Sequence, residues 1–241
     1  MQAILLAGGL GTRLRSVVND RPKPMAFIEG RPFMEYVVHE LAKAGITDLI
    51  FAVGYRGEMV EDYFGDGSGF AAPDGTSLRV RYAWEKELLG TAGAIRNAGR
   101  FIMEDAFFVL NADTFYRIDY SRLAQIQREK ALDLALVLRR VPDITRYGEA
   151  TLAEGMLTGF NEKTEEARPG TINGGIYYMK RELLDEIPEG KVSLENQMIP
   201  QWLTGGKRLG GFVHDGYFID IGIPEAYYQF IADVKKGVVT W

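Results

Sequence analysis

The chain has 241 residues, of which 46% are hydrophobic, and its formal net charge is −5. The negative charge disfavours a broad attraction to nucleic acid or to an anionic membrane, whereas a small phosphorylated ligand needs only a few local cations. Because there is no cysteine and only two histidines, disulfides, thiolate metal sites and histidine-built zinc sites are excluded, so carboxylates must hold any metal, which favours Mg²⁺.

The first seven residues are apolar and lead directly into a glycine-rich turn. They predict a strand and not a signal peptide. No apolar run approaches the roughly 20 residues that span a bilayer. We therefore expect a cytoplasmic protein with no membrane or nucleic-acid partner.

Strand and helix patterns alternate through the first half of the chain. Apolar runs predict strands over residues 2–7, 48–53, 78–84 and 106–110. Helical patterns cover residues 33–44, 58–64 and 91–98. The alternation predicts an α/β fold with a mixed, mostly parallel central sheet and helices on both faces, in three α/β/α layers. In such sheets ligands bind beyond the carboxyl ends of the strands.

The second half of the chain is less regular. Apolar runs predict strands over residues 132–140, 149–152, 157–160, 172–179 and 210–213. Helices are predicted over 181–186, 194–203 and 224 to about 236, the last with a proline in its first turn. No stretch is long enough to be a domain linker, so we expect a single domain over residues 1–241.

A glycine-rich turn over residues 8–14 follows the first predicted strand, and Lys23 comes soon after it between two prolines. Glycines let backbone N–H groups approach an anion closely, and Arg13 and Lys23 would neutralise its charge. A P-loop is excluded because Gly11 is followed by Thr-Arg, and a dinucleotide fingerprint because Leu14 stands where its third glycine belongs. The pattern favours a phosphate site of another kind over an ordinary tight turn.

Two aspartates follow apolar runs at predicted strand ends, Asp113 in Asn-Ala-Asp and Asp220 in Tyr-Phe-Ile-Asp. Taken singly, each is also typical of a turn or a helix cap. Mg²⁺ is commonly held by one or two carboxylates together with substrate phosphate oxygens. With the glycine turn and Lys23 in the same chain, the pair predicts a Mg²⁺ site for nucleotidyl transfer, a reaction that depends on positioning and charge stabilisation.

Four further motifs accompany the glycine turn and its Pro-Lys-Pro-Met continuation. They are Leu89-Gly90-Thr91-Ala92-Gly93-Ala94, Asn111-Ala112-Asp113, Glu162-Lys163 and Asn173-Gly174-Gly175-Ile176-Tyr177. In this order the set resembles the sugar-phosphate nucleotidyltransferases over essentially the whole chain. The resemblance implies a Rossmann-like nucleotidyltransferase domain that joins a nucleoside triphosphate to a sugar 1-phosphate and releases pyrophosphate. It implies that the N-terminal half mainly binds the nucleotide and the C-terminal half the sugar phosphate.

The resemblance also implies roles for individual residues. The residues that would bind the nucleotide are Leu6, Ala7, Gly8, Gly9, Gly11, Thr12, Arg13, Glu85, Gly90 and Asn111. The residues that would bind the sugar phosphate are Gly148, Glu162, Lys163, Asn173 and Gly174. The implied catalytic residues are Arg13, Lys23, Asp113, Lys163 and Asp220, with Asp113 and Asp220 as the metal ligands. The nucleophile is an ionised phosphate, so no general base is needed.

The base and the sugar are suggested by local features. Guanine offers two adjacent donors that one carboxylate accepts, so Glu85 could read guanine with help from the Gly90 backbone; a plain solvent-facing role for Glu85 stays open. Segments 31–36, 193–197 and 216–225 resemble D-glycero-α-D-manno-heptose 1-phosphate guanylyltransferases. That resemblance implies synthesis of GDP-heptose from GTP for a surface glycan such as a lipopolysaccharide, capsule or S-layer.

Other interpretations stay open. Mannose 1-phosphate with GTP, N-acetylmuramic acid 1-phosphate with UTP, and glucose 1-phosphate with UTP or dTTP are alternative substrate pairs. A non-catalytic sugar-nucleotide sensor should lack part of the set Arg13, Lys23, Asp113 and Asp220, and all four are present. A glycosyltransferase is a third class, weakened by Asn-Ala-Asp in place of Asp-x-Asp. Glu162-Lys163 could be a solvated surface pair, and Thr91 could be a helix N-cap. The protein could also form a homodimer.

Overall fold

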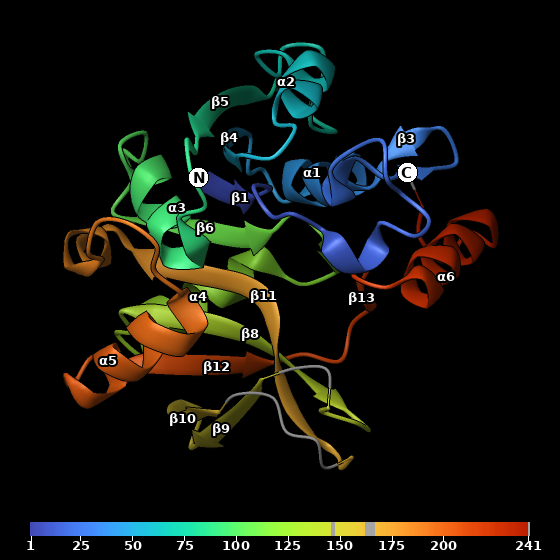
Figure 1. Cartoon of the computed structure of the whole chain (residues 1–241). Helices are drawn as coiled ribbons and strands as arrows, with labels where there is room; N and C mark the ends of the chain where they lie inside the picture. Colours follow the sequence, from blue (N-terminus) through green and yellow to red (C-terminus); the bar gives the residue numbers. More distant parts are fainter. Residues whose placement is uncertain (146–147, 162–166, 241) are drawn as a thin grey trace. The chain divides into compact units, whose positions relative to one another are not determined.

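The computed structural model describes residues 1–145, 148–161 and 167–240 (Figure 1). The chain divides into two compact units. The first contains Met1–Leu88, Asn111–Arg117 and the residues from Tyr217 onward; the second contains Leu89–Leu110 and Ile118–Gly216. The expectation of a single domain stays a prediction, because two compact units can belong to one domain or to two.

A parallel sheet forms the centre of the first unit. Its strands are β1 (Gln2–Leu6), β4 (Asp48–Val53) and β5 (Arg79–Trp84), with β4 between the other two. These strands are nearly continuous apolar runs, and Ile4, Leu5 and Ile50 are fully buried, as is typical of parallel strands covered on both faces. The helices α1 (Phe33–Lys43) and α2 (Glu58–Phe64) belong to this unit.

Short elements complete the first unit. They are two 3₁₀ turns, η1 (Thr12–Leu14) and η2 (Lys23–Met25), the strand pairs β2 (Phe27–Ile28) with β3 (Arg31–Pro32) and β7 (Thr114–Tyr116) with β13 (Phe218–Asp220), and the helix α6 (Pro224–Lys235). Phe230 of α6 is fully buried, with its ring centroid 4.8 Å from that of Phe33 and 5.4 Å from that of Phe115. This helix therefore contributes to the core of the unit.

A mixed sheet forms the centre of the second unit. Its strands run in the order β6 (Ala106–Asn111), β11 (Gly170–Lys180), β8 (Leu134–Val141), β12 (Leu209–Val213), β10 (Met156–Asn161) and β9 (Glu149–Ala153). β12 pairs with β8 in parallel, and the other pairings described between these neighbours are antiparallel. Residues Glu154 and Gly155 join β9 to β10, both with positive φ, which is the geometry of a type I′ hairpin turn.

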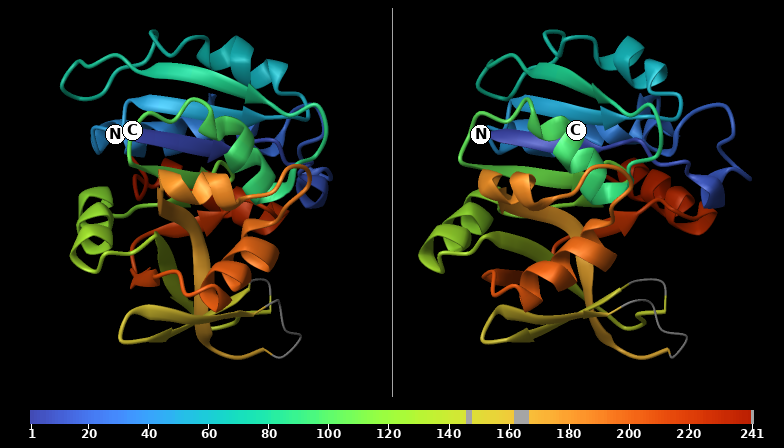
Figure 2. Two further views of the ribbon diagram at one scale, coloured as in Figure 1. Left: turned by 90° about the vertical axis from the view of Figure 1, so that its left-hand side faces the viewer. Right: turned by 60° about the vertical axis from the view of Figure 1, so that its left-hand side comes forward.

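Helices cover both faces of the second unit's sheet (Figure 2). The helix α4 (Tyr120–Glu129) lies on one face, where Tyr120 and Tyr178 pack against Phe108 at 5.4 and 4.5 Å. On the other face lie α3 (Gly90–Gly99), the π-turn η4 (Leu194–Met198) and α5 (Ile199–Thr204), as Figure 2 also shows. The 3₁₀ segment η3 (Arg181–Glu186) follows β11.

The mixed α/β fold is confirmed, and most predicted elements lie within two residues of the observed ones. Parallel pairing dominates the first unit and antiparallel pairing the second, because short connections such as Glu154-Gly155 allow only antiparallel neighbours. The helix α4 was not predicted. The helix predicted over 194–203 is instead η4 followed by α5, since Pro200 lacks the N–H that a continuous helix needs. Among the described helices, none has the length and apolar character needed to cross a membrane.

Candidate functional site

The glycine-rich turn leaves the end of β1 and reaches η1 in the first unit. Gly11 has φ 58°, a conformation that favours glycine, and a Cβ there would lie 3.0 Å from the Cβ of Lys23. Within the part of the chain that the structure describes, the backbone N–H groups of Gly9, Gly11 and Thr12 donate to no backbone carbonyl. The turn can therefore offer these donors to an anion, as the sequence predicts.

The first glycine of the turn lies against Glu85. A Cβ at Gly8 would overlap the Glu85 carboxylate. Glu85 directly follows β5, and its N–H donates to the carbonyl of Val53 at 2.8 Å. The carboxylate predicted to read the base is thus held beside the predicted phosphate turn by the pairing of β4 with β5.

Three further nucleotide-site candidates lie at strand ends. Leu6 is the last residue of β1, and its carbonyl accepts a hydrogen bond from the N–H of Ala112 at 3.2 Å. Ala7 is buried and donates to the carbonyl of Ala52 at 2.8 Å. Asn111 is the last residue of β6. These positions agree with a site beyond the carboxyl ends of strands.

Lys23 lies close to both predicted metal ligands, Asp113 and Asp220. Its Nζ contacts the Oδ2 of Asp113 and lies 4.0 Å from the Oδ1 of Asp220. The Lys23 side chain is 13% exposed, and those of Asp113 and Asp220 are 27% and 20% exposed, so the three side chains are largely buried but still accessible to solvent. The structure brings together three residues that are far apart in the sequence.

The pairing of β7 with β13 sets this arrangement. Asp220 lies opposite Thr114 in the antiparallel register, and the carbonyl of Asp113 accepts a hydrogen bond from the N–H of Ile221 at 3.1 Å. Each carboxylate also has a local donor: Thr114 Oγ1 at 3.3 Å for Asp113 and the Gly222 N–H at 2.7 Å for Asp220. The two aspartates are therefore placed by backbone pairing.

The electrostatics of Asp220 reflect these neighbours. Burial raises the pKa of Asp220, the nearby Asp113 carboxylate raises it further, and the cations Lys23 and Arg13 oppose both effects. Arg13 is exposed, and its guanidinium reaches the same region: a Cβ at Gly222 would lie 3.4 Å from its Nη2. A cation between the two carboxylates stabilises both as anions.

The donor set fits a hard divalent cation. Among the described residues, no group of three or more His, Cys, Asp and Glu side chains could hold a metal by itself. Mg²⁺ does not require such a group, because it usually keeps several waters and takes one or two carboxylates plus phosphate oxygens of a substrate. Asp113 and Asp220 provide two carboxylates, and the glycine turn of the same unit offers donors for a phosphate.

In the second unit, Asn173 and Gly174 lie in a bulge of β11. Asn173 is opposite Leu138 of β8 and Tyr177 is opposite Leu136, so three residues of β11 lie between these pairs where β8 has one. Gly175 in the bulge has φ 73°, and its N–H donates to Asn173 Oδ1 at 3.0 Å. The Asn-Gly-Gly motif is therefore neither a simple turn nor a regular strand.

The other candidates of the second unit have different surroundings. Gly148 packs tightly on β10, since a Cβ there would lie 3.0 Å from the carbonyl oxygen of Asn161. Gly90 is the first residue of α3 with φ 69°, and a Cβ there would lie 2.5 Å from the carbonyl oxygen of Val192. Close packing thus requires glycine at position 90. Glu162 and Lys163 lie outside the described residues.

Sequence reasoning missed the hydrogen-bond partners of Asn173 and the role of Thr91. Asn173 Nδ2 donates to the hydroxyl of Tyr177, which donates to Glu195, and Glu195 also accepts from Thr91. Thr91 lies inside α3 and is not its N-cap, a position that Leu89 occupies. No local pattern in the sequence signals these contacts.

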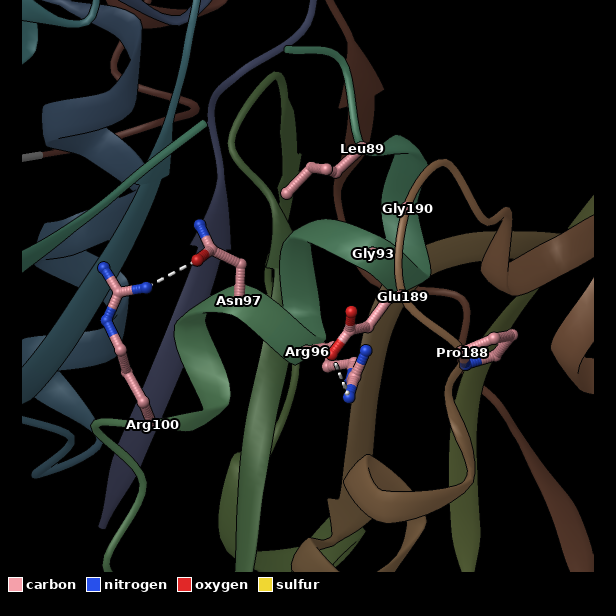
Figure 3. A pocket seen from close by; sticks show the side chains of 8 residues that line it. All are labelled: Leu89, Gly93, Arg96, Asn97, Arg100, Pro188, Glu189 and Gly190. Carbon is pink, nitrogen blue, oxygen red and sulfur yellow. Dashed lines mark hydrogen bonds and ion pairs between the residues drawn. The ribbon is translucent and has the colours of Figure 1, made fainter. Parts of the chain in front are cut away.

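A pocket of about 330 Å³ opens beside α3 in the second unit (Figure 3). The residues that line it are Leu89, Gly93, Arg96, Asn97, Arg100, Pro188, Glu189 and Gly190. Its two arginines are already paired, Arg96 with Glu189 at 3.1 Å and Arg100 with Asn97 at 2.5 Å. None of the predicted site residues that the structure describes lines this pocket.

Comparison with known proteins identifies the relatives of this chain. A family model described as Nucleotidyl transferase matches residues 2–237. The D-glycero-alpha-D-manno-heptose 1-phosphate guanylyltransferase of Campylobacter jejuni is 39% identical over 233 residues, which cover 96% of this chain and 99% of that protein. The protein of the same name from Aneurinibacillus thermoaerophilus is 37% identical over 94% of this chain and 95% of its own length.

A solved structure is similar as well. The crystal structure of HddC from Yersinia pseudotuberculosis complexed with GMP-PN has a TM-score of 0.83 and 33% sequence identity to this chain. The match covers 96% of this chain and 98% of that one. Similarity of sequence and of structure thus extends over nearly the full length of both proteins.

Proposed function

The chain belongs to the nucleotidyl transferase family and is a sugar-1-phosphate nucleotidyltransferase, and we propose that it transfers GMP from GTP to D-glycero-α-D-manno-heptose 1-phosphate. The products are GDP-heptose and pyrophosphate. The observation that carries this choice of substrates is the near-full-length match to the two heptose 1-phosphate guanylyltransferases. The geometry of the first unit supports the reaction class.

The glycine turn binds the triphosphate of GTP in this proposal. The N–H groups of Gly9, Gly11 and Thr12 donate to no described backbone carbonyl. They can therefore donate to the phosphate oxygens. Gly8 allows the nucleotide to pass close to the backbone beside Glu85. Arg13 is exposed at the turn and stabilises the charge that develops on the leaving pyrophosphate.

Asp113 and Asp220 hold a Mg²⁺ ion, and Lys23 completes the charge balance of this group. When bound, the ion supplies charge stabilisation for the phosphates during in-line displacement. Lys23 contacts the α-phosphate region and keeps the two carboxylates together before substrates arrive. Both oxygens that face Lys23 come from side chains anchored by the β7–β13 pair.

The sugar 1-phosphate is bound by residues of the second unit. Asn173 in the β11 bulge has an amide that can contact sugar hydroxyls, and the Gly148 and Gly174 backbones complete the contacts. Glu162 contacts the sugar and Lys163 positions its phosphate; both roles come from the family resemblance. The sugar phosphate attacks the α-phosphorus of GTP as an anion, so no general base takes part.

Glu85 selects guanine. A carboxylate accepts both N1–H and the N2 amino group of guanine, whereas uracil and thymine offer one such donor. Its position beside Gly8, at the start of the phosphate turn, supports this role over a solvent-facing one. The loss of preference for GTP over UTP and dTTP in a Glu85→Gln protein is the matching test.

One panel experiment tests the proposal. The protein is incubated with Mg²⁺, each nucleoside triphosphate in turn, and heptose, mannose, N-acetylmuramic acid or glucose 1-phosphate, and pyrophosphate is measured. We expect the highest kcat/KM for GTP with heptose 1-phosphate. Release with GTP and mannose 1-phosphate alone would reassign the sugar, and no release with any pair would favour a sensor.

The product is proposed to feed a surface glycan such as a lipopolysaccharide, capsule or S-layer, with synthesis in the cytoplasm. This place for the reaction rests on the family resemblance. A homodimer is a further prediction, which sedimentation of the purified protein checks.

A further inference from the structure

Four polar side chains of the second unit form one hydrogen-bonded chain. Asn173 Nδ2 lies 2.5 Å from the hydroxyl of Tyr177, and this hydroxyl lies 2.8 Å from Glu195 Oε1. The Oε2 of Glu195 lies 2.7 Å from Thr91 Oγ1, which in turn accepts a hydrogen bond from the N–H of Leu194 at 2.7 Å. These hydrogen bonds link β11, η4 and the first turn of α3.

The bulge of β11 makes the first link possible. In a regular strand, residues four positions apart are separated by about 13 Å. Because Asn173 and Tyr177 lie opposite Leu138 and Leu136, the two glycines between them are extra residues that shorten this separation to that of two strand positions. The two side chains thus share one face of the sheet and touch.

Each hydrogen bond between these side chains can run in one direction only. A carboxylate only accepts, so the Tyr177 hydroxyl must donate to Glu195 and can only accept from Asn173. Asn173 must therefore turn its NH₂ group toward Tyr177, and its Oδ1 accepts from the Gly175 N–H at 3.0 Å. The positions of the oxygen and nitrogen of this amide therefore follow from its two hydrogen-bond partners, Tyr177 and Gly175.

Burial keeps this direction constant. Tyr177 is fully buried, and both burial and the Glu195 carboxylate raise the pKa of Tyr177 well above its ordinary value, so the hydroxyl stays protonated and donates. Asn173 itself is only half-buried. Within the described part of the chain, its second Nδ2 hydrogen and the second lone pair of its Oδ1 have no hydrogen-bond partner, which gives one donor and one acceptor for a ligand at fixed places.

We propose that Tyr177 and Glu195 are positioning residues that hold the Asn173 amide in one orientation for the hydroxyls of the sugar 1-phosphate. The inference rests on the proposed function, in which Asn173 contacts the sugar. A fixed donor and acceptor recognise two sugar hydroxyls in a defined relative configuration. Thr91 on α3 forms the far end of this series of hydrogen bonds. It lies next to Gly90, one of the residues predicted to bind the nucleotide.

Tyr177→Phe is the primary test, because it keeps the buried ring and removes only the hydroxyl. The Asn173 amide then loses its acceptor and can rotate. We expect KM for the sugar 1-phosphate to rise about tenfold, the effect of losing one hydrogen bond between neutral groups, while KM for GTP stays within about twofold. Equal changes in both KM values, or no change in either, would overturn the proposal.

Tyr178→Phe is the matched control. It makes the same change one residue further along β11, on the opposite face, where the ring packs on Phe108 at 4.5 Å. We expect its KM for the sugar 1-phosphate to match the wild type. A tenfold rise in this variant as well would indicate general damage to the strand and overturn the proposal.

Glu195 provides a second variant pair. Glu195→Ala removes the acceptor for Tyr177, so we expect a rise in sugar KM at least as large as that of Tyr177→Phe. Glu195→Gln keeps an acceptor oxygen and should recover most of that loss. If Ala and Gln give the same KM, Glu195 does not act through the Tyr177 hydroxyl.

A readout without turnover separates this inference from the proposed function. The side-chain amide of Asn173, assigned by its loss in Asn173→Asp, is followed by nitrogen-15 NMR. Its signal should move in Tyr177→Phe and stay in place in Tyr178→Phe, and an unmoved signal in Tyr177→Phe would overturn the inference. A wild-type protein that releases no pyrophosphate would instead overturn the proposed function.

Discussion

The ammonium group of Lys23 contacts the carboxylate of Asp113, and the same Nζ atom lies 4.0 Å from Asp220. One cation thus lies near two carboxylates that would otherwise repel each other. Asp113 is among the neighbours that raise the pKa of Asp220, and Lys23 opposes this effect. The predictions on metal dependence and stability follow from this arrangement.

Removing either carboxylate should abolish most activity without unfolding the protein. We expect Asp113→Asn and Asp220→Asn to lower kcat/KM by about 100-fold or more, because each loses an anionic oxygen for the metal. Pyrophosphate release measures the effect, and a chelator added to the wild type should reproduce it. Full turnover in excess chelator would contradict the metal site.

Lys23 should contribute to stability as well as to catalysis. In Lys23→Met without metal, the two carboxylates lose their cation, and we expect the free energy of unfolding to fall by about 1–3 kcal/mol. Urea denaturation measures this, and added Mg²⁺ should restore part of the loss. Lys43→Met, which removes a surface pair with Glu40, is the control and should cost less than about 0.5 kcal/mol. Equal losses in both variants would argue against the arrangement.

Gly8 should be required because Glu85 occupies the space of a side chain. Gly8→Ala forces the Glu85 carboxylate to move, and we expect a loss of about 1–3 kcal/mol in unfolding free energy together with a higher KM for GTP. In Gly8→Ala/Glu85→Ala the stability loss should largely disappear. Gly69→Ala, with nothing within 4 Å of the added Cβ, is the control for the substitution itself. Additive losses in the double variant would contradict the contact.

Arg13 should act on turnover and not on folding, since its side chain is exposed. We expect Arg13→Ala to lower kcat by about 100-fold while the melting temperature is unchanged. Arg15→Ala is the matched control in the same turn, where the guanidinium lies 5.5 Å from the centroid of Tyr55. A folded Arg13→Ala protein with full kcat would remove Arg13 from the site.

His39 should make stability sensitive to mild acid. Burial lowers the pKa of His39 in the folded protein, so the unfolded chain binds the proton more readily. The corresponding stability is complete above the unfolded pKa of about 6.5 and is lost as pH falls from there through the lower folded pKa. Urea denaturation at pH 7 and pH 5 should show a larger loss for the wild type than for His39→Gln. Parallel curves would contradict the assignment.

Local patterns in the sequence predicted much of the fold. Strands β1 and β4 and helices α1 and α2 were located within one residue, because burial on two faces and helical periodicity are visible in short windows. α4 was missed, and η4 was merged with α5. In the second case the effect of Pro200 on the backbone outweighed the apolar spacing.

The glycine turn, the two aspartates at strand ends and the order of motifs could be predicted from the residues alone, because glycine conformation and strand ends are local properties. Three contacts became visible only in the folded chain: Lys23 reaches Asp113 and Asp220, Glu85 lies against Gly8, and a bulge brings Asn173 to Tyr177. These contacts depend on the register of strands that are distant along the chain, such as β7 with β13. Register is set by the packing of the whole sheet, and a short window of sequence does not contain it.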